Sequence, residues 1–424
     1  MGELREGAGL ARACAWMWIA LTLLFFAGCT EDDESLCGEF PLTEAERVCI
    51  QDKVEARVVR FYPFVGDKEG VSLRKFSHQL REIDLGADDL QFLEDLQRVL
   101  ATLQDGHTQI GLPAGEPRGM PPLALRDIGE EVFVAWSGVE GVEAGDQIVG
   151  VDGELVADTI EELLPLIAAS TPEARRRSAV RALLSGPRSE AVGVRFLRDG
   201  ESRELLLERL EVVQAVPRSP EGRRFGDVGY IRVSSFAFVD DAEVFDGLLG
   251  ELRDTRALIL DLRENGGGRG LNPNLLLGRF IEEELPDFEL QKRDGEVKAR
   301  LKAIPRGEPY RGRLVVLSDV FTYSAANYLV HRVRFHDLGV VIGERSGGGS
   351  AQRIQVELVD GLPFIYSRRR LVDPEGVDFE QGLEPDIAIE LTPQDLREGL
   401  GIRSGDPATD GVLAEALRLI EEDL

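Results

Sequence analysis

The sequence predicts an α/β protein of several domains: a helical N-terminal segment, a β-rich inserted unit and an α/β core. Its 424 residues exceed one ordinary core and suggest about two or three domains, and a hydrophobic fraction of 43% can fill them. From Gly229 onwards, short apolar runs bounded by turn residues alternate with helical segments. Such runs suit strands buried on both faces, in a sheet that helices cover.

The first 28 residues carry the pattern of an export signal. Arg5 and Arg12 precede an apolar run at 13–27 that is too short to span a bilayer. Small residues directly before Cys29 resemble a bacterial lipobox, in which cleavage at 1–28 frees this cysteine for lipid attachment. An ordinary signal peptide and an uncleaved membrane anchor are the alternatives.

The residues after the signal also fit an exported protein. Residues 29–39 are acidic and predict a solvated tether. Thr30 stands where an aspartate often retains lipoproteins at the inner membrane, so we expect the cell envelope of a bacterium, at the outer membrane or in the periplasm. Cys37 and Cys49 remain as an even pair, which predicts one local disulfide in an oxidising compartment.

The composition excludes several classes of partner. A formal net charge of −28 would repel nucleic acid and anionic membrane surfaces, so a lipid would be the means of membrane attachment. The chain has four histidines, and it has neither a CxxC pair nor an HExxH motif. We therefore expect no metal site and no cofactor.

Residues 40–122 are expected to be mainly helical and to carry a candidate histidine. Glycine at Gly106 ends the helical pattern and leaves His107 on a turn. Before that turn, apolar residues recur at three- and four-residue steps and predict one apolar helix face: Leu90, Phe92, Leu93, Leu96, Val99, Leu100 and Leu103.

Residues 123–211 predict a compact unit of about 90 residues, within the usual size of a small domain. An alternating strand at 131–136 opens the unit. One helix at 159–168 and two closing strands at 192–198 and 201–208 complete it.

Ser324 is the candidate nucleophile in the α/β core at residues 212–424. An apolar strand ends at Ser318, a short turn follows, and a helix pattern begins with Ser324. A hydroxyl at that place meets the positive end of a helix and its free backbone amides, and both favour an oxyanion. The alternative is a serine that only caps the helix.

A nucleophilic serine needs a base within hydrogen-bond reach, and His107 is the best candidate by elimination. His331 lies about 10 Å of rise along the same helix, and His336 lies further still. His78 sits in a mostly polar helical stretch. A lysine is the other possible base, but the sequence has none after Lys302, so a Ser–Lys dyad would need a lysine from before the nucleophile.

The loop at 261–268 ends in three glycines and is a candidate oxyanion hole. Glycine amides can approach a ligand closely, as such a site requires. A phosphate-binding loop is a rival interpretation, but the GK[ST] ending and the GxGxxG spacing are both missing. A flexible turn is the remaining alternative.

In this order the motifs resemble those of the tricorn-core and carboxyl-terminal processing proteases. The resemblance covers residues 40–424, nearly the whole mature chain, and implies a core of the crotonase-like or ClpP type. The matching segments are Asp105–Thr108, Glu143–Gly153, Asp261–Gly268, Thr322–Ala326, Val341–Gly348 and Gly382–Asp386.

The resemblance implies a serine peptidase with a Ser–His–Glu triad. Carboxyl-terminal processing members use a Ser–Lys pair, but the corresponding loop here has glycine at the lysine position. Tricorn-like members use serine, histidine and glutamate, and Ser324, His107 and Glu380 match those places. Ser324 would attack the peptide carbonyl, His107 would move the proton, and Glu380 would orient the imidazole. The amides of Ala325 and Gly267 would bind the oxyanion.

By the same resemblance, residues 123–211 look like a PDZ domain with its signature at 145–153. Such domains add a peptide strand to a sheet edge and often hold the free carboxylate of the peptide. We therefore expect an exported, lipid-anchored serine endopeptidase whose partners are peptides or unfolded protein segments. The alternative is a catalytically inactive relative that binds peptides in the periplasm or at the cell surface. A hydrolase of esters or lipids is a third hypothesis.

Overall fold

The computed structural model describes residues 35–111, 118–211 and 220–422. The predicted signal segment, the lipidation site Cys29 and most of the acidic tether lie outside these ranges. The described residues from Leu36 onwards form one compact unit. Among the described helices, none combines the length and the apolar composition that crossing a membrane would require.

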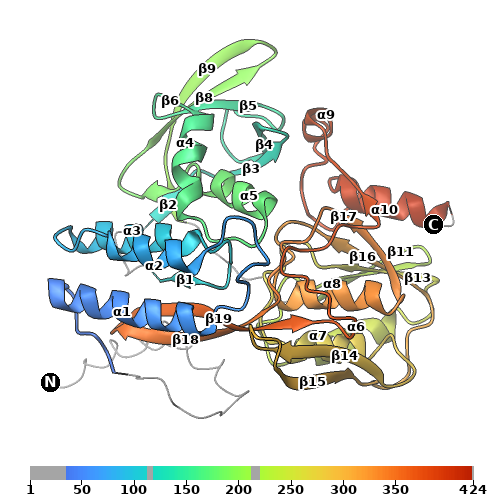
Figure 1. Cartoon of the computed structure of the whole chain (residues 1–424). Helices are drawn as coiled ribbons and strands as arrows, with labels where there is room; N and C mark the ends of the chain where they lie inside the picture. The colour runs from blue at the N-terminus through green and yellow to red at the C-terminus, as the bar shows by residue number, and fades with distance from the viewer. Residues whose placement is uncertain (1–34, 112–117, 212–219, 423–424) are drawn as a thin grey trace, which may run out of the picture. The chain divides into compact units, whose positions relative to one another are not determined.

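Three helices form the N-terminal segment, as predicted: α1 (Glu44–Phe61), α2 (Leu73–Arg81) and α3 (Asp89–Ala101). Each begins where a Thr, Ser or Asp side chain accepts a free amide of the first turn. A disulfide joins Cys37 to Cys49 in α1. The apolar helix faces pack on a hairpin made of β18 (Ala351–Val359) and β19 (Leu362–Val372), and Figure 1 shows α1 alongside it.

The inserted unit is an antiparallel sheet with a hydrophobic core of its own. Its strands run in the order β3-β4-β5-β8-β9, and β6 pairs with β5. A smaller sheet with the order β10-β2-β7 lies at the base of the unit. The strand bounds are β2 (Arg118–Met120), β3 (Leu123–Ile128), β4 (Glu131–Ser137), β5 (Gln147–Val151), β6 (Glu154–Leu155), β7 (Gly186–Pro187), β8 (Val192–Arg198), β9 (Glu201–Leu207) and β10 (Leu210–Glu211).

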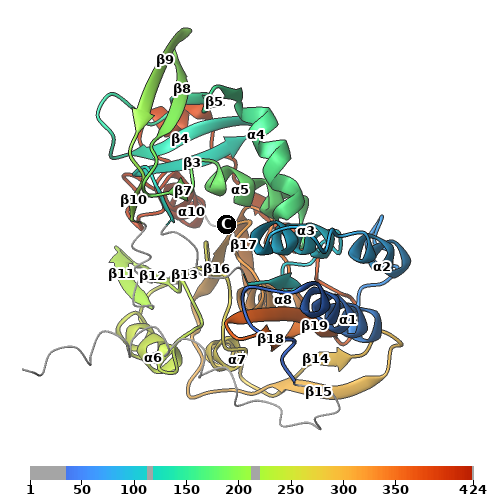
Figure 2. The ribbon, with the colours of Figure 1, turned by 90° about the vertical axis from the view of Figure 1, so that its left-hand side faces the viewer.

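Two helices cover this sheet where the sequence predicted one at 159–168. The first, α4 (Val156–Leu163), gives way to a short 3₁₀ turn at Pro165. Proline cannot continue an α-helix because it lacks the N–H and its ring clashes with the preceding turn. The second helix, α5 (Pro172–Ala182), then starts afresh and lies beside β3, as Figure 2 shows.

The α/β core contains a six-stranded sheet whose strands are parallel except at one edge. The order is β11-β12-β13-β16-β17-β20, and β11 is the antiparallel strand. The bounds are β11 (Glu221–Phe225), β12 (Val228–Arg232), β13 (Ala257–Asp261), β16 (Arg313–Ser318), β17 (Gly339–Gly343) and β20 (Ile387–Ala388). Every residue of β13 is buried, as the apolar run predicted.

Helices cover both faces of this sheet, because alternate strand residues point to opposite sides. One face packs on α6 (Asp241–Glu251), α7 (Leu271–Leu277) and α8 (Ala325–Phe335). The other face packs on α10 (Gly411–Glu421), and Figure 1 shows α8 and α10 on opposite sides. The predicted mixed α/β class is therefore confirmed.

A second sheet extends from the core toward the N-terminal helices. Its order is β1-β19-β14-β15, with β18 paired to β19. The remaining bounds are β1 (Gln109–Ile110), β14 (Leu285–Gln291), β15 (Val297–Ala303) and α9 (Pro393–Arg397). Because β1 directly follows the His107 turn, its pairing with β19 ties that turn to the core.

Candidate active site

Ser324 lies at the carboxyl edge of the parallel sheet, between the end of β16 and the start of α8. Its backbone has φ 53° and ψ −120°, a conformation that residues other than glycine rarely adopt. Ser324 N donates to Gly348 O at 2.9 Å, and Tyr323 N donates to Asn265 O at 2.9 Å. The side chain makes no capping hydrogen bond to the helix. Strain of this kind clusters at functional sites, and here it presents a hydroxyl that does not cap the helix beside the helix N-terminus.

His107 lies on the turn after α3, against the hydroxyl of Ser324. The Asp105 carboxylate fixes this turn, because it accepts the His107 N–H at 2.9 Å and the Thr108 hydroxyl at 2.6 Å. The distance between His107 Nε2 and Ser324 Oγ is 2.9 Å, which is a direct hydrogen bond. The ring centre of His107 also lies 4.9 Å from that of Tyr323. The structure thus brings together the residues predicted as nucleophile and base.

The surroundings of His107 keep its imidazole neutral. Burial lowers the pKa of His107 to about 4, against the opposing effect of the Asp105 carboxylate. The positive charges of Arg353 and Lys68 lower this pKa further. A neutral imidazole can accept the proton of a serine hydroxyl. The other ring nitrogen, Nδ1, has no hydrogen-bond partner among the described residues.

Glu380 is buried nearby, but its carboxylate oxygens are occupied by other donors. Oε1 accepts from Lys68 Nζ at 3.0 Å and from Ser170 Oγ at 2.6 Å. Oε2 accepts from Ser350 N at 2.6 Å. Burial raises the pKa of Glu380 to about 7, although the Lys68 ammonium lowers it. The expectation of a simple triad, in which Glu380 touches the His107 ring, is therefore corrected: no hydrogen bond joins them in the described chain.

Two residues of this cluster were not predicted from the sequence. Lys68 lies in the polar loop between α1 and α2, and Ser170 lies in the loop before α5. Ser170 Oγ also accepts the Gly106 N–H at 3.3 Å and lies 3.2 Å from Tyr323 Oη. Neither loop carries a motif, so the only signal available was the residue type.

The glycine loop packs on the nucleophile, but Gly267 is not placed as an oxyanion donor. Its φ is 94°, and a Cβ at this position would lie 2.8 Å from Ser324 Cβ. Only glycine fits such a close approach at positive φ. The Gly267 N–H is already donated to Asn265 Oδ1 at 2.9 Å. The prediction for this amide is therefore wrong, because the neighbouring side chain uses the donor.

Among the described residues, the Ala325 N–H adjoins Ser324 and the Gly268 N–H follows Gly267 in the glycine loop, and neither donates to another backbone group outside the regular elements. Phe236 N donates to Gly267 O and Arg269 N donates to Phe236 O, so the Gly268 N–H points to the opposite side of the loop. Ala325 is the first residue of α8, where backbone N–H groups have no partner within the helix.

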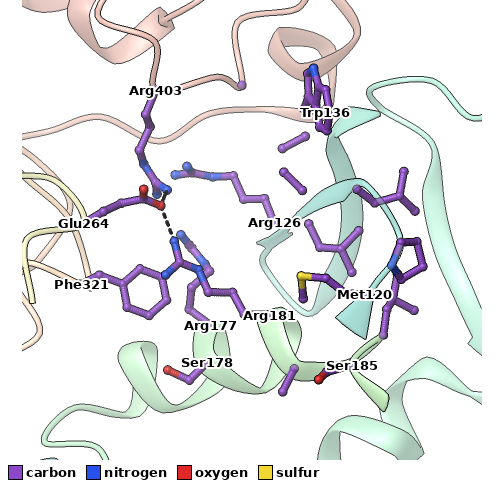
Figure 3. A pocket seen from close by; sticks show the side chains of 18 of the residues that line it. Met120, Arg126, Trp136, Arg177, Ser178, Arg181, Ser185, Glu264, Phe321 and Arg403 are labelled. Carbon is purple, nitrogen blue, oxygen red and sulfur yellow. Dashed lines mark hydrogen bonds and ion pairs between the residues drawn. The ribbon is translucent and has the colours of Figure 1, made fainter. Parts of the chain in front are cut away.

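A pocket of about 920 Å³ lies between the inserted unit and the α/β core. Figure 3 shows Arg181 of α5 and Arg403 of the core directed at Glu264, which begins the turn before the three glycines. Arg403 binds Glu264 at 2.6 Å, and Arg181 pairs with the same carboxylate. Phe321 lies under the Arg181 guanidinium at 3.6 Å, and Trp136 lines the far wall. The pocket is thus lined by apolar side chains, with arginines that are paired to carboxylates along one side.

Known proteins similar to this chain are proteases. The carboxy-terminal processing protease CtpB of Bacillus subtilis is 24% identical over 257 residues, which are 59% of this chain and 49% of that protein. The chloroplastic C-terminal processing peptidase of Tetradesmus obliquus is 26% identical over 294 residues, 63% of this chain and 58% of that protein. The tricorn protease of Thermoplasma acidophilum is 25% identical over 54% of this chain and 21% of its own length. The chain thus spans about half the length of the curated relatives it matches.

Solved structures share the fold. Mature CPAF, in complex with lactacystin, has a TM-score of 0.71 at 15% identity, covering 88% of this chain and 98% of that chain. The photosystem II D1 C-terminal processing protease has a TM-score of 0.52 at 21% identity, covering 88% and 100%. Peptidase family S41 matches residues 227–389, which hold the parallel strands of the sheet, the glycine loop and Ser324. The predicted resemblance is confirmed: residues 227–389 match a peptidase S41 family domain.

Proposed function

We propose that this protein is an exported serine endopeptidase that cleaves peptides or unfolded protein segments through an acyl-enzyme on Ser324. The observation that carries the proposal is the 2.9 Å hydrogen bond between Ser324 Oγ and His107 Nε2. Three further features support it: the strained turn that exposes the hydroxyl, the neutral imidazole and the helix N-terminus beside them.

The geometry accounts for each step of acyl transfer. Ser324 Oγ attacks the carbonyl carbon while His107 Nε2 takes its proton, and the imidazolium then returns that proton to the leaving amine. A water molecule then attacks the acyl-enzyme while His107 takes its proton, and His107 returns that proton to Ser324 Oγ as the ester bond breaks. The N–H groups of Ala325 and Gly268 would donate to the oxyanion at the positive end of α8. Glu380 acts indirectly: its hydrogen bonds hold the segments that carry the two reacting side chains.

The inserted unit would bind the substrate chain, as its resemblance to a PDZ domain implies. β3 is an edge strand of its sheet, so its unpaired backbone groups can accept an added peptide strand. The pocket runs along β3 and α5 toward the glycine loop. The arginines along one side of the pocket are paired with Glu264 and Glu344, so its apolar side would be the part that favours aliphatic or aromatic residues of a substrate.

Export and lipid anchoring belong to the same proposal. The Cys37–Cys49 disulfide supports an oxidising compartment. The small residues before Cys29 support a lipid on that cysteine. In bacterial cells fed a radiolabelled fatty acid, the full chain should incorporate label and Cys29→Ser should not. Label retained by Cys29→Ser would remove the anchor from the proposal.

Reaction with a fluorophosphonate probe tests the catalytic proposal. Wild type should be labelled, and Ser324→Ala should not. His107→Ala should slow labelling on the order of 100- to 10,000-fold, the usual contribution of a general base. Ser202→Ala and His78→Ala are matched controls, because both residues are exposed.

Each other outcome selects a different function. Labelling that survives Ser324→Ala would refute the mechanism. A wild type that binds peptides at the pocket but never reacts would point to the non-catalytic binding protein. Turnover of short acyl esters, with none of unfolded protein or peptides, would point to the ester hydrolase.

A further inference from the structure

Lys68 is a buried cation for which the acyl-transfer steps have no use. Its side chain is 1% exposed, although lysine is almost never fully buried unless it is paired. Nζ donates to Glu380 Oε1 at 3.0 Å and to Gln104 O at 2.5 Å, and it lies 4.6 Å from the ring centre of Phe64. Both acceptors carry a negative charge or partial charge, so they complement the positive charge of the lysine side chain.

One acceptor of Lys68 belongs to the turn that carries the base. Gln104 begins that turn with a φ of 52°, and His107 follows three residues later. Ser170 holds the same turn from the other side, because its Oγ accepts the Gly106 N–H at 3.3 Å. Ser170 in turn donates to Glu380 Oε1 at 2.6 Å. The Glu380 carboxylate therefore joins both supports of the His107 turn.

The same carboxylate also reaches the segment that holds the nucleophile. Glu380 Oε2 accepts the Ser350 N–H at 2.6 Å, and Glu380 O accepts the Gly349 N–H at 2.9 Å. The adjacent Gly348 O accepts the Ser324 N–H at 2.9 Å. The ionised carboxylate is thus an acceptor shared by the two segments whose alignment sets the distance between the reacting atoms.

An ionised Glu380 needs a cation, because the charges around it are otherwise unfavourable. Burial raises its pKa first, and the carboxylates of Asp105 and Asp378 raise it further. Lys68 is the cation that opposes these effects, and its side chain and that of Glu380 are 1% and 3% exposed. Without Lys68, the favoured state would be the protonated acid, which is a weaker acceptor for its remaining donors.

We propose that Lys68 is a positioning residue: it keeps Glu380 ionised and fastens the His107 turn through Gln104 O. This inference rests on the proposed peptidase function, since it assigns Lys68 a part in aligning His107 with Ser324. The hydrogen bonds of Lys68 go to Glu380 and Gln104, and none joins it to Ser324 or His107 among the described residues. It acts through the carboxylate and the turn.

The variant Lys68→Met tests the proposal in the full chain. Fluorophosphonate labelling rates are measured from pH 5.5 to 9.5, beside Lys75→Met, a matched control at an exposed position of α2. The rate should rise with pH as Glu380 ionises, and Lys68→Met should displace this rise upward by at least about one pH unit, the usual effect of losing an adjacent opposite charge. The double variant Lys68→Met/Glu380→Gln should show no rise, because its carboxyl is gone.

A second measurement does not depend on activity. With ¹³C-labelled glutamate, the carboxyl signal that is lost in Glu380→Gln can be followed through a pH titration in wild type and Lys68→Met. The midpoint pH of this signal should be higher in Lys68→Met than in wild type, by the same amount as the midpoint of the labelling profile. Lys68→Gln, which keeps a polar side chain but loses the charge, replaces Lys68→Met if thermal melting shows that the methionine variant is unfolded.

The outcomes separate this inference from the proposed function. Both midpoints moving upward supports the role of Lys68. A carboxyl midpoint that moves in a protein that never labels, wild type included, keeps the ion pair and refutes the peptidase. A labelling rate that falls equally at every pH, with an unmoved carboxyl midpoint, shows a merely structural lysine and overturns the inference.

Discussion

Raising the pH from 6 to 8 should accelerate labelling of Ser324 through ionisation of Glu380, and not of His107. Burial lowers the pKa of His107 to about 4, so about 99% of the imidazole is already neutral at pH 6. Burial raises the pKa of Glu380 to about 7, so its ionised fraction increases about tenfold over the same interval. Only the ionised carboxylate accepts fully from Lys68, Ser170 and Ser350. The labelling rate should therefore rise up to about tenfold, with a midpoint near pH 7.

The assay is a pH profile of the labelling rate for wild type, Glu380→Gln and the exposed control Glu357→Gln. The Glu380 amide mimics the protonated acid, so its profile should stay flat and low from pH 6 to 9. Ser324→Ala supplies the background at each pH. A rise near pH 7 that persists unchanged in Glu380→Gln would refute the reasoning, because that ionisation would then belong to another group, with His107 the first candidate.

Three further substitutions test separate parts of the structure. Gly267→Ala should slow labelling at least about tenfold, because its Cβ would press on the nucleophile, whereas Gly250→Ala in α6 meets nothing and should label normally. Glu344→Gln should destabilise the fold by about 3 kcal/mol in denaturant melts at pH 7. Although burial opposes it, Arg126, Arg177 and Arg403 lower the Glu344 pKa to about 2, so this stability is present above pH 4.5 and is lost as pH falls toward 2. The stability difference between wild type and variant should therefore vanish near pH 2, and a difference of the same size at pH 7 and pH 2 would contradict it. Cys49→Ser removes a disulfide with a sequence separation of 12 and should lower the free energy of unfolding by about 3 kcal/mol in thermal melts. A wild type that is equally stable in its oxidised and reduced forms would contradict this.

The sequence was sufficient to predict the reacting pair, because each member sits at a break in a regular pattern. An apolar strand, a short turn and a helix locate Ser324, and a glycine after an amphipathic helix locates His107. The chain has four histidines, so the candidates for the base could be reduced to one by elimination. The pair is 217 residues apart in the chain, and the order of the motifs, which resembles that of a known family, decided between a nucleophile and a capping serine.

The parts that were missed depend on contacts that no local pattern records. Lys68 lies 312 residues from Glu380 in sequence, and Ser170 lies 210 residues from it. Both stand in loops, where position is set by packing and not by periodicity. The prediction for the Gly267 amide failed for a different reason. Three glycines show where amides are accessible, but the Asn265 side chain accepts one of these N–H groups and removes it as a donor.

The buried lysine bears on which residue acts as base. The sequence argued against a Ser–Lys dyad because the chain has no lysine after Lys302, and the structure does bring an earlier one, Lys68, close to the site. A general base must reach the proton that it accepts, but Lys68 Nζ is directed at a carboxylate and a carbonyl, and no hydrogen bond joins it to Ser324 among the described residues. His107, in contrast, is hydrogen-bonded to the Ser324 hydroxyl. Burial and two nearby cations lower the pKa of its imidazole and keep the ring neutral. Lys68 therefore supplies the positive charge beside Glu380, and His107 transfers the proton. The histidine remains the base even though a lysine lies close to the site.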